Sequence, residues 1–215
     1  MSNNLIKRLI TSIILLIILF FVNFSHEYIF ILSLLILGVL ICNEFSKIFK
    51  NLVGYNFLIL NTIAFLYIFF VFGRLSYEVY ILKNPTFFLF ILSVCIFSDI
   101  GGYVFGKTLG GKKLTKISPN KTVFGLIGSF ILSVIPILIF SNLNNIELDI
   151  NLKSIIFCLL ISLVNQLGDL FISYLKRKAH IKDTGKILPG HGGLLDRMDG
   201  IIFAVPFSYY LIKII

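Results

Sequence analysis

Charged residues are scarce in this chain. Only 13% of its 215 residues are Asp, Glu, Lys or Arg, whereas 58% are hydrophobic. Soluble domains carry about a quarter charged residues, so this composition excludes a soluble domain and favours an integral membrane protein. The sequence also lacks a Gly/Ser-rich linker and an internal repeat of the kind that would divide it into further domains.

Cysteine motifs and a signal-peptide cleavage site are also absent. Cys42, Cys95 and Cys158 stand singly in apolar stretches, without a CxxC pair or a His at metal-ligand spacing, so we expect them to be packing residues. Lys7 and Arg8 precede an apolar run, but no small-residue cleavage site follows it. We therefore expect this run to remain in the protein as a helix.

Long apolar windows account for most of the sequence. Windows near the roughly 20 residues that cross a bilayer must form helices, because lipid offers no partner to the backbone. The sequence predicts an all-α, polytopic integral membrane protein of about seven transmembrane helices, with no soluble domain. The expected spans are residues 9–24, 28–42, 57–72, 86–106, 123–141, 154–174 and 200–215. The last is the weakest, because it is short and contains Pro206.

The basic residues indicate an orientation. The chain has 19 Lys and Arg against 10 acids, a formal charge of +9, and basic residues mark the cytoplasmic side of membrane proteins. A cytoplasmic N-terminus places most of the 19, and both long polar loops, on the cytoplasmic face. We expect a multi-pass protein of the inner (cytoplasmic) membrane whose active site faces the cytoplasm.

One polar stripe interrupts the span at 154–174. Asn165, Asp169 and Ser173 recur every four residues and therefore share a helix face, with Lys176 three residues further on. A carboxylate within a span is costly and by default indicates a functional site. A helix-to-helix hydrogen bond or a position reached by interfacial water is the alternative. Gln166 beside this stripe and Asp99 in an earlier span are secondary candidates.

The densest polar segment runs from Ser173 to Asp199. Two of its three acids, Asp196 and Asp199, share one face if the helix into the last span has already begun. Glycines in the turn at 189–193 allow a ligand to approach the backbone closely. Acids interleaved with six basic residues suit Mg²⁺ and a polyphosphate. An ordinary capped interhelical loop is the alternative, and basic residues alone would indicate only membrane-surface electrostatics.

The other polar loop, residues 98–125, offers a weaker phosphate site. Gly106 to Lys112 fits G-x-x-x-x-G-K, but Lys113 stands where Ser or Thr is needed, so we reject a P-loop. Glycines at 102, 106 and 110 indicate close helix packing. Ser118 and Pro119 predict a helix start whose free N–H groups, beside Lys121 and Thr122, could hold a phosphate. A capped interfacial helix with snorkelling lysines is equally compatible.

These motifs together resemble the phosphatidate cytidylyltransferases, the CDP-diacylglycerol synthases. The segment SYLKRKAHIKDTGKILPGHGGLLDRMD, residues 173–199, is similar to the family signature, and the polar motifs around Asp99, Ser118 and Asp169 occur in the expected order. The similarity covers about the last 120 residues. We therefore divide the chain into N-terminal transmembrane helices, 1–85, and a C-terminal catalytic region, 86–215. The family commonly has Glu where Phe124 stands and Ser where Gly200 stands.

The resemblance implies transfer of a cytidylyl group from CTP to phosphatidate, giving CDP-diacylglycerol and pyrophosphate. It implies Mg²⁺, with K⁺ as a further cation, the bilayer and a homodimer as partners, and no nucleic acid. The lipid phosphate is expected to attack the α-phosphorus in line. The implied catalytic residues are Asp169, Lys176, Arg177, Asp196, Arg197 and Asp199. The acids at 169, 196 and 199 are the implied metal ligands. The implied phosphate and substrate ligands are Ser118, Lys121, Thr122, Ser173, Lys182, Asp183, His191, Gly192 and Gly193.

Two other functions share part of this pattern. A CTP-dependent lipid or polyprenol kinase, or a cytidylyltransferase for an ether-lipid phosphate, would use the same nucleotide and metal with another acceptor. An ion or solute transporter would also place Asp99 and Asp169 in spans, but it would bring them near the bilayer midplane. The polar groups here are expected at cytoplasmic helix ends, which favours catalysis.

Overall fold

A computed structural model of the chain describes residues 3–53, 57–115, 117–142, 149–185, 187–188 and 192–214, with side chains from residue 10 onward. The described residues form helices without a β-strand, and two isolated β-bridges, Lys113 to Thr122 and Leu188 to Gly192, are the only extended pairings among them. The expected all-α class is confirmed. The helices fall into two compact units, residues 1–77 with 175–198 and residues 78–174 with 199–215.

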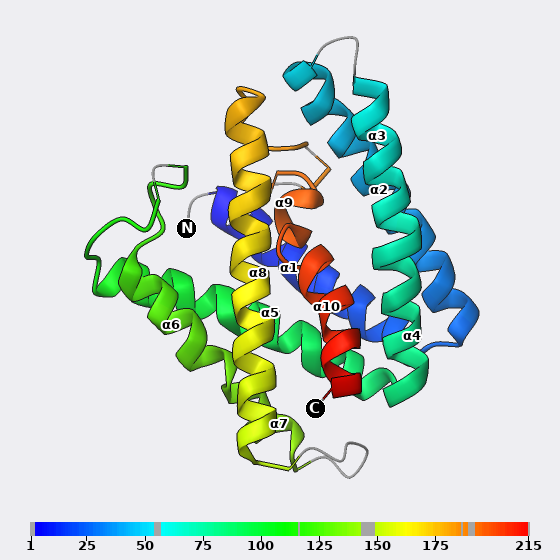
Figure 1. Ribbon diagram of the computed structural model, residues 1–215, viewed down its shortest axis with the longest axis vertical. Coiled ribbons are helices and arrows are strands. Elements are labelled where there is room, and N and C mark those ends of the chain that lie inside the picture. The colour runs from blue at the N-terminus through cyan, green and yellow to red at the C-terminus, as the bar shows by residue number, and fades with distance from the viewer. Residues whose placement is uncertain are drawn as a thin grey trace. The chain divides into compact units, whose positions relative to one another are not determined.

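The first unit is built around a long helix, α2. It contains α1 (Asn3–Phe24), α2 (Glu27–Val53), α3 (Phe57–Leu66), the π-helix η2 (Tyr67–Gly73), the start of α4 (Arg74–Lys83), the end of α8 (Leu152–Lys178) and α9 (Leu195–Met198). One face of α2 supplies buried side chains, among them Ile41, Phe45 and Ile48. Helix α3 and η2 pack against α2, and α3 lies beside it in Figure 1.

The second unit holds α5 (Pro85–Thr108), α6 (Val123–Ser133), α7 (Ile135–Phe140), most of α8 and α10 (Ile201–Ile214). Helix α5 begins cleanly because Asn84 Oδ1 accepts the backbone N–H of Phe87 at 2.8 Å and Pro85 occupies the first turn. Helices α5 and α6 run side by side (Figure 1). Side chains of Phe90 and Phe157 stack between α5 and α8, with 6.2 Å between ring centroids.

Glycines allow the close approach of α5 and α6. A side chain at Gly101 would meet the carbonyl of Gly128, and one at Gly102 would lie 2.8 Å from Ser129 Oγ. The predicted close packing is therefore confirmed for Gly102. It is wrong for Gly110, which lies beyond the end of α5 with φ of +62° and nothing near its absent side chain.

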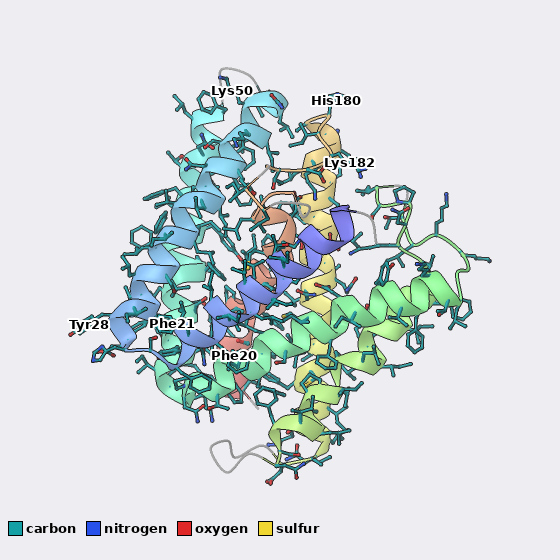
Figure 2. All side chains as sticks on the ribbon, turned by 180° about the vertical axis from the view of Figure 1, so that it is seen from behind. Phe20, Phe21, Tyr28, Lys50, His180 and Lys182 are labelled. Atoms are coloured by element: carbon teal, nitrogen blue, oxygen red, sulfur yellow. The ribbon has the colours of Figure 1, made fainter. Side chains whose placement is uncertain are left out.

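Five helices of the described chain are long and apolar enough to cross a membrane, by length and composition. They cover Glu27–Val53, Phe57–Lys83, Pro85–Thr108, Val123–Phe140 and Leu152–Lys178. Helix α1 contributes a shorter apolar stretch, Ile10–Phe24. Its Phe20 and Phe21 and the first-turn Tyr28 of α2 are exposed, as expected of side chains that face lipid (Figure 2). The protein is thus a polytopic membrane protein, and a count of seven spans with an inside N-terminus stays a prediction.

Several expected span boundaries were wrong. Helix α2 continues to Val53 instead of ending near residue 42, and the helix expected to end at 72 continues through η2 and α4 to Lys83. The polar residues that follow each apolar run, such as Asn43 and Arg74, suggested the earlier ends, but these residues are part of the helices. Helix α10 has 14 residues, or about 21 Å at the helical rise, which is shorter than a bilayer core of about 30 Å.

Candidate functional site

A connected polar network lies in the second unit, where α5, α8 and the loop before α6 meet. Asn165 Nδ2 of α8 donates to Asp99 Oδ1 of α5 at 2.8 Å, and Gln166 Nε2 approaches the same oxygen at 3.4 Å. Gln166 also donates to Ser98 Oγ at 3.3 Å, and Ser98 pairs with Ser162 at 2.8 Å. Asp99 thus contacts two side chains of α8 from within α5, which continues to Thr108.

The same network continues to Asp169 through a lysine. Lys121 Nζ donates to Gln166 Oε1 at 3.3 Å and lies 2.5 Å from Asp169 Oδ2. Ser173 Oγ donates to Asp169 Oδ1 at 3.2 Å, so the predicted stripe at every fourth residue of α8 is formed. The side chain of Asp169 is 27% exposed, so a ligand can reach this carboxylate.

The loop that carries Lys121 is a short hairpin. Leu114 N–H donates to the Lys121 carbonyl at 2.8 Å and Val123 N–H donates to the Lys112 carbonyl at 3.0 Å. The prediction of a helix start at Ser118 and Pro119 is wrong, because the hairpin holds these residues in a turn, with Lys121 N–H donating to the Ser118 carbonyl. Helix α6 begins at Val123, and its N-cap is Thr122, whose Oγ1 accepts the Gly125 N–H at 3.0 Å.

The two departures from the family pattern have structural explanations. Phe124 lies against the open end of this hairpin: a side chain at Gly111, which has φ of +93°, would lie 2.6 Å from the Phe124 ring. Gly200 lies directly against Asn165, so a side chain there would meet the Asn165 amide oxygen. That oxygen is buried without a hydrogen-bond partner in the described structure. Phe124 therefore packs against the loop backbone. An acid, which the family commonly has at this position, would place a charge there instead.

A second cluster lies in the first unit and surrounds Asp196 of α9. Lys176 Nζ of α8 donates to Asp196 Oδ1 at 2.7 Å, and the N–H groups of Thr184 and Gly193 each donate to Asp196 Oδ2 at 2.9 Å. Burial alone would raise the pKa of the Asp196 carboxyl. The hydrogen bond from Lys176 and those from the two N–H groups outweigh burial and hold this pKa below its ordinary value.

Glu44 of α2 is a member of this cluster that sequence reasoning missed. Its side chain is fully buried and accepts the Thr184 hydroxyl at 2.6 Å and the N–H groups of Leu194 and Leu195 at 3.0 and 2.8 Å. Thr184, 3% exposed, was missed too. The available signal was an acid just after the long apolar run at residues 28–42, which, like Asp169, could have been considered as a functional position.

The other predicted residues take more peripheral places. Arg177, Lys182, Asp183 and Arg197 are exposed, and Lys182 projects from the segment after α8 (Figure 2). Gly192 has φ of +86° in the turn before α9. Asp196 and Asp199 do not share one continuous helix, because α9 ends at Met198 and α10 begins at Ile201, so the condition for a shared helix face is not met. His191 lies outside the described residues.

The chemistry of both clusters suits a cation and phosphates. Asp169 and Asp196 are oxygen donors, the class that Mg²⁺ prefers, and each is paired with a lysine that could turn to a phosphate. Within the described residues, no group of three or more His, Cys, Asp or Glu side chains forms a closed metal site.

Comparison with known proteins covers most of the chain. A sequence profile described as the cytidylyltransferase family matches residues 50–215. A phosphatidate cytidylyltransferase of Bacillus subtilis is 42% identical over 129 residues, 59% of this chain and 48% of that protein. Proteins of the same name from Rickettsia bellii and Helicobacter pylori (strain J99) are 43% and 45% identical, over 64% and 54% of this chain and 63% and 42% of theirs. The chain thus spans about half the length of the curated relatives it matches.

Proposed function

Because this chain belongs to the cytidylyltransferase family, we propose that it transfers a cytidylyl group from CTP to phosphatidate. The products would be CDP-diacylglycerol and pyrophosphate, and the active site would face the cytoplasm. The observation that carries the proposal is a repeated one: two acids of the polar motifs, Asp169 and Asp196, each pair with a lysine from another part of the chain. A phosphoryl site needs this combination of metal-binding and phosphate-binding groups.

The reaction itself demands little from a general base. An anionic phosphate oxygen of phosphatidate attacks the α-phosphorus of CTP, a new P–O bond forms, and the bond to the β-phosphate oxygen breaks. The protein must align the two phosphates and neutralise the developing charge. We assign charge neutralisation to Lys121, Lys176, Arg177 and Arg197, and alignment of the polyphosphate to the backbone around Gly192 and Gly193.

Magnesium fits the acids of both clusters. Asp169 Oδ1 accepts only a neutral serine hydroxyl among the described contacts, and Asp196 Oδ1 accepts only Lys176. Each oxygen has a second lone pair for a cation. We propose Asp169 as a ligand in the second unit and Asp196 as a ligand in the first, with Asp199 next in order. When bound, Mg²⁺ would supply charge neutralisation at the phosphate oxygens.

The test is conversion of labelled CTP by purified protein in detergent, with phosphatidate, an ether-lipid phosphate and a polyprenol as separate acceptors. Magnesium-dependent formation of CDP-diacylglycerol is expected with phosphatidate. Transfer of the γ-phosphate to the polyprenol, or activity with the ether lipid alone, would replace the proposed acceptor. Asp169→Asn and Asp196→Asn should each lower kcat by about 100-fold or more at unchanged protein level. Full activity in either variant would overturn its assignment as a ligand.

A further inference from the structure

We infer that Glu44 is the positioning residue of the polar segment 179–196, which follows α8 and includes the start of α9. It lies outside residues 50–215, the part that matches the family, and it is the only charged side chain among the buried residues of α2. Its carboxylate is fully buried and receives three hydrogen bonds, all from this one segment. The role deepens the proposed function and rests on it, because the segment positioned is the one that carries Asp196.

The hydrogen bonds of Glu44 join the two ends of the segment. Thr184 stands near its start and Leu194 and Leu195 stand at its end, yet all three donate to the same carboxylate. Asp196 repeats the arrangement from the other side, since its Oδ2 accepts the N–H groups of Thr184 and Gly193. Two carboxylates thereby join Thr184 to the residues at 193–195.

The surrounding glycines show that the carboxylate occupies a space shaped for it. A side chain at Gly185 would lie 2.6 Å from Glu44 Oε1. A side chain at Gly193 would collide with the Thr184 hydroxyl and with the Glu44 carboxylate. Both positions therefore need glycine because Glu44 is present, quite apart from any ligand. Glu44, about 140 positions earlier in the chain, therefore explains part of the glycine content of this segment.

A carboxylate is needed at this position, because every group that faces it is a donor. The described contacts of Glu44 are one hydroxyl and two backbone N–H groups. In Glu44→Gln, one carboxylate oxygen is replaced by an NH₂ group, which is a donor. This NH₂ would face a backbone N–H, and that buried N–H would have no acceptor. Loss of this contact would let the segment open, and Asp196 would lose its alignment to Lys176.

The experiment compares Glu44→Gln with Ile41→Ala. Ile41 is fully buried on the same helix and close in sequence to Glu44, so Ile41→Ala measures the effect of a general loss of core packing. At a temperature where both variants are folded, Glu44→Gln should lower kcat by at least tenfold with a smaller change in KM for CTP. Ile41→Ala should lower the melting temperature and leave kcat per folded protein near the wild-type value. Equal kcat in wild type and Glu44→Gln would overturn the positioning role.

A second readout does not depend on activity. Hydrogen exchange at the amides of Leu194 and Leu195 should be faster in Glu44→Gln than in wild type, and unchanged in Ile41→Ala. If wild-type protein fails to make CDP-diacylglycerol but this exchange pattern is found, the proposed reaction fails and the positioning of the segment stands. If the amides exchange alike in all three proteins, the inference about Glu44 fails whatever the reaction is.

Discussion

At the scale of single residues, an acid–lysine pair lies at the centre of each of the two clusters, one in each unit. Both lysines come from segments distant in sequence from the acid that they contact, Lys121 by 48 positions and Lys176 by 20 positions. Removing such a pair from water costs free energy that can cancel the attraction between the two charges. A contribution to stability is therefore a weak explanation for the presence of these pairs. In both pairs the acid also accepts further hydrogen bonds, so its position is fixed in the absence of substrate.

Lys121 is the residue whose role can be separated from general loop charge. Lys121→Met removes the contacts to Asp169 and Gln166 and should lower kcat/KM for CTP by about 10- to 100-fold, since one charge-assisted interaction is lost. Lys112 lies in the same hairpin and is exposed, so Lys112→Met removes the same charge without these contacts. Initial rates with both purified variants measure the difference. Equal losses would show that only the net charge of the loop matters.

Asp196 should make stability dependent on pH. Its pKa in the folded protein is held below the ordinary value, so the folded protein loses the stabilisation from this carboxylate only when the pH falls through that lowered pKa. With a chelator present, Asp196→Asn should melt below wild type at pH 7, and the gap should narrow as the pH falls below about 4. Melting curves from pH 3 to 8 measure it.

The control for this pH series is Asp149→Asn. Asp149 is exposed and precedes α8, so its removal takes away one carboxylate without a comparable set of contacts from a lysine and backbone N–H groups. The melting temperature of this variant should follow wild type across the range. A gap for Asp196→Asn that stays constant from pH 3 to 8 would contradict the assignment of the effect to its charge.

At the scale of elements, the α5–α6 pair depends on glycines at particular positions. Gly101→Ala would place its methyl group against the backbone of Gly128, which cannot move aside, and should destabilise the protein by about 1–3 kcal/mol. Gly106 is on the same helix, but there an added methyl group would lie 3.4 Å from Thr122 Oγ1, near ordinary contact. Gly106→Ala should therefore be close to neutral. Thermal unfolding in detergent distinguishes the two, and similar melting temperatures would contradict the packing argument.

The elements also show what the sequence could and could not reveal. The stripe on α8 was predictable because its period is local, and Ser173 does contact Asp169. The extension of α2 past residue 42 was not, because the polar Glu44 looks like the end of a span until its partners are known. These partners, Thr184, Leu194 and Leu195, are set by the tertiary fold. The hairpin before α6 likewise overrode the local Ser-Pro signal for a helix start.

At the scale of the whole molecule, composition alone determined the class, since a chain with 13% charged residues cannot form a soluble domain of ordinary kind. The number of spans was harder to predict, because the apolar stretch of α1, Ile10–Phe24, and helix α10 are short and span assignment depends on length. Helix α8 avoids this difficulty. Its 27 residues extend about 40 Å, which exceeds the hydrocarbon core.

The orientation of the protein can therefore be tested at the two ends of α8. After Cys42, Cys95 and Cys158 are replaced by Ser, single cysteines are introduced as Asp149→Cys and Lys182→Cys, at exposed positions before and after the helix. Because α8 is long enough to span, an impermeant thiol reagent added outside intact cells should label one position and leave the other unlabelled. The basic residues around 176–182 predict that position 149 is the one labelled. Lysis should then expose position 182, which verifies that this thiol is reactive. Labelling of position 182 alone in intact cells would reverse the orientation and move the proposed site away from the cytoplasm where CTP is found, while labelling of both would contradict α8 as a span.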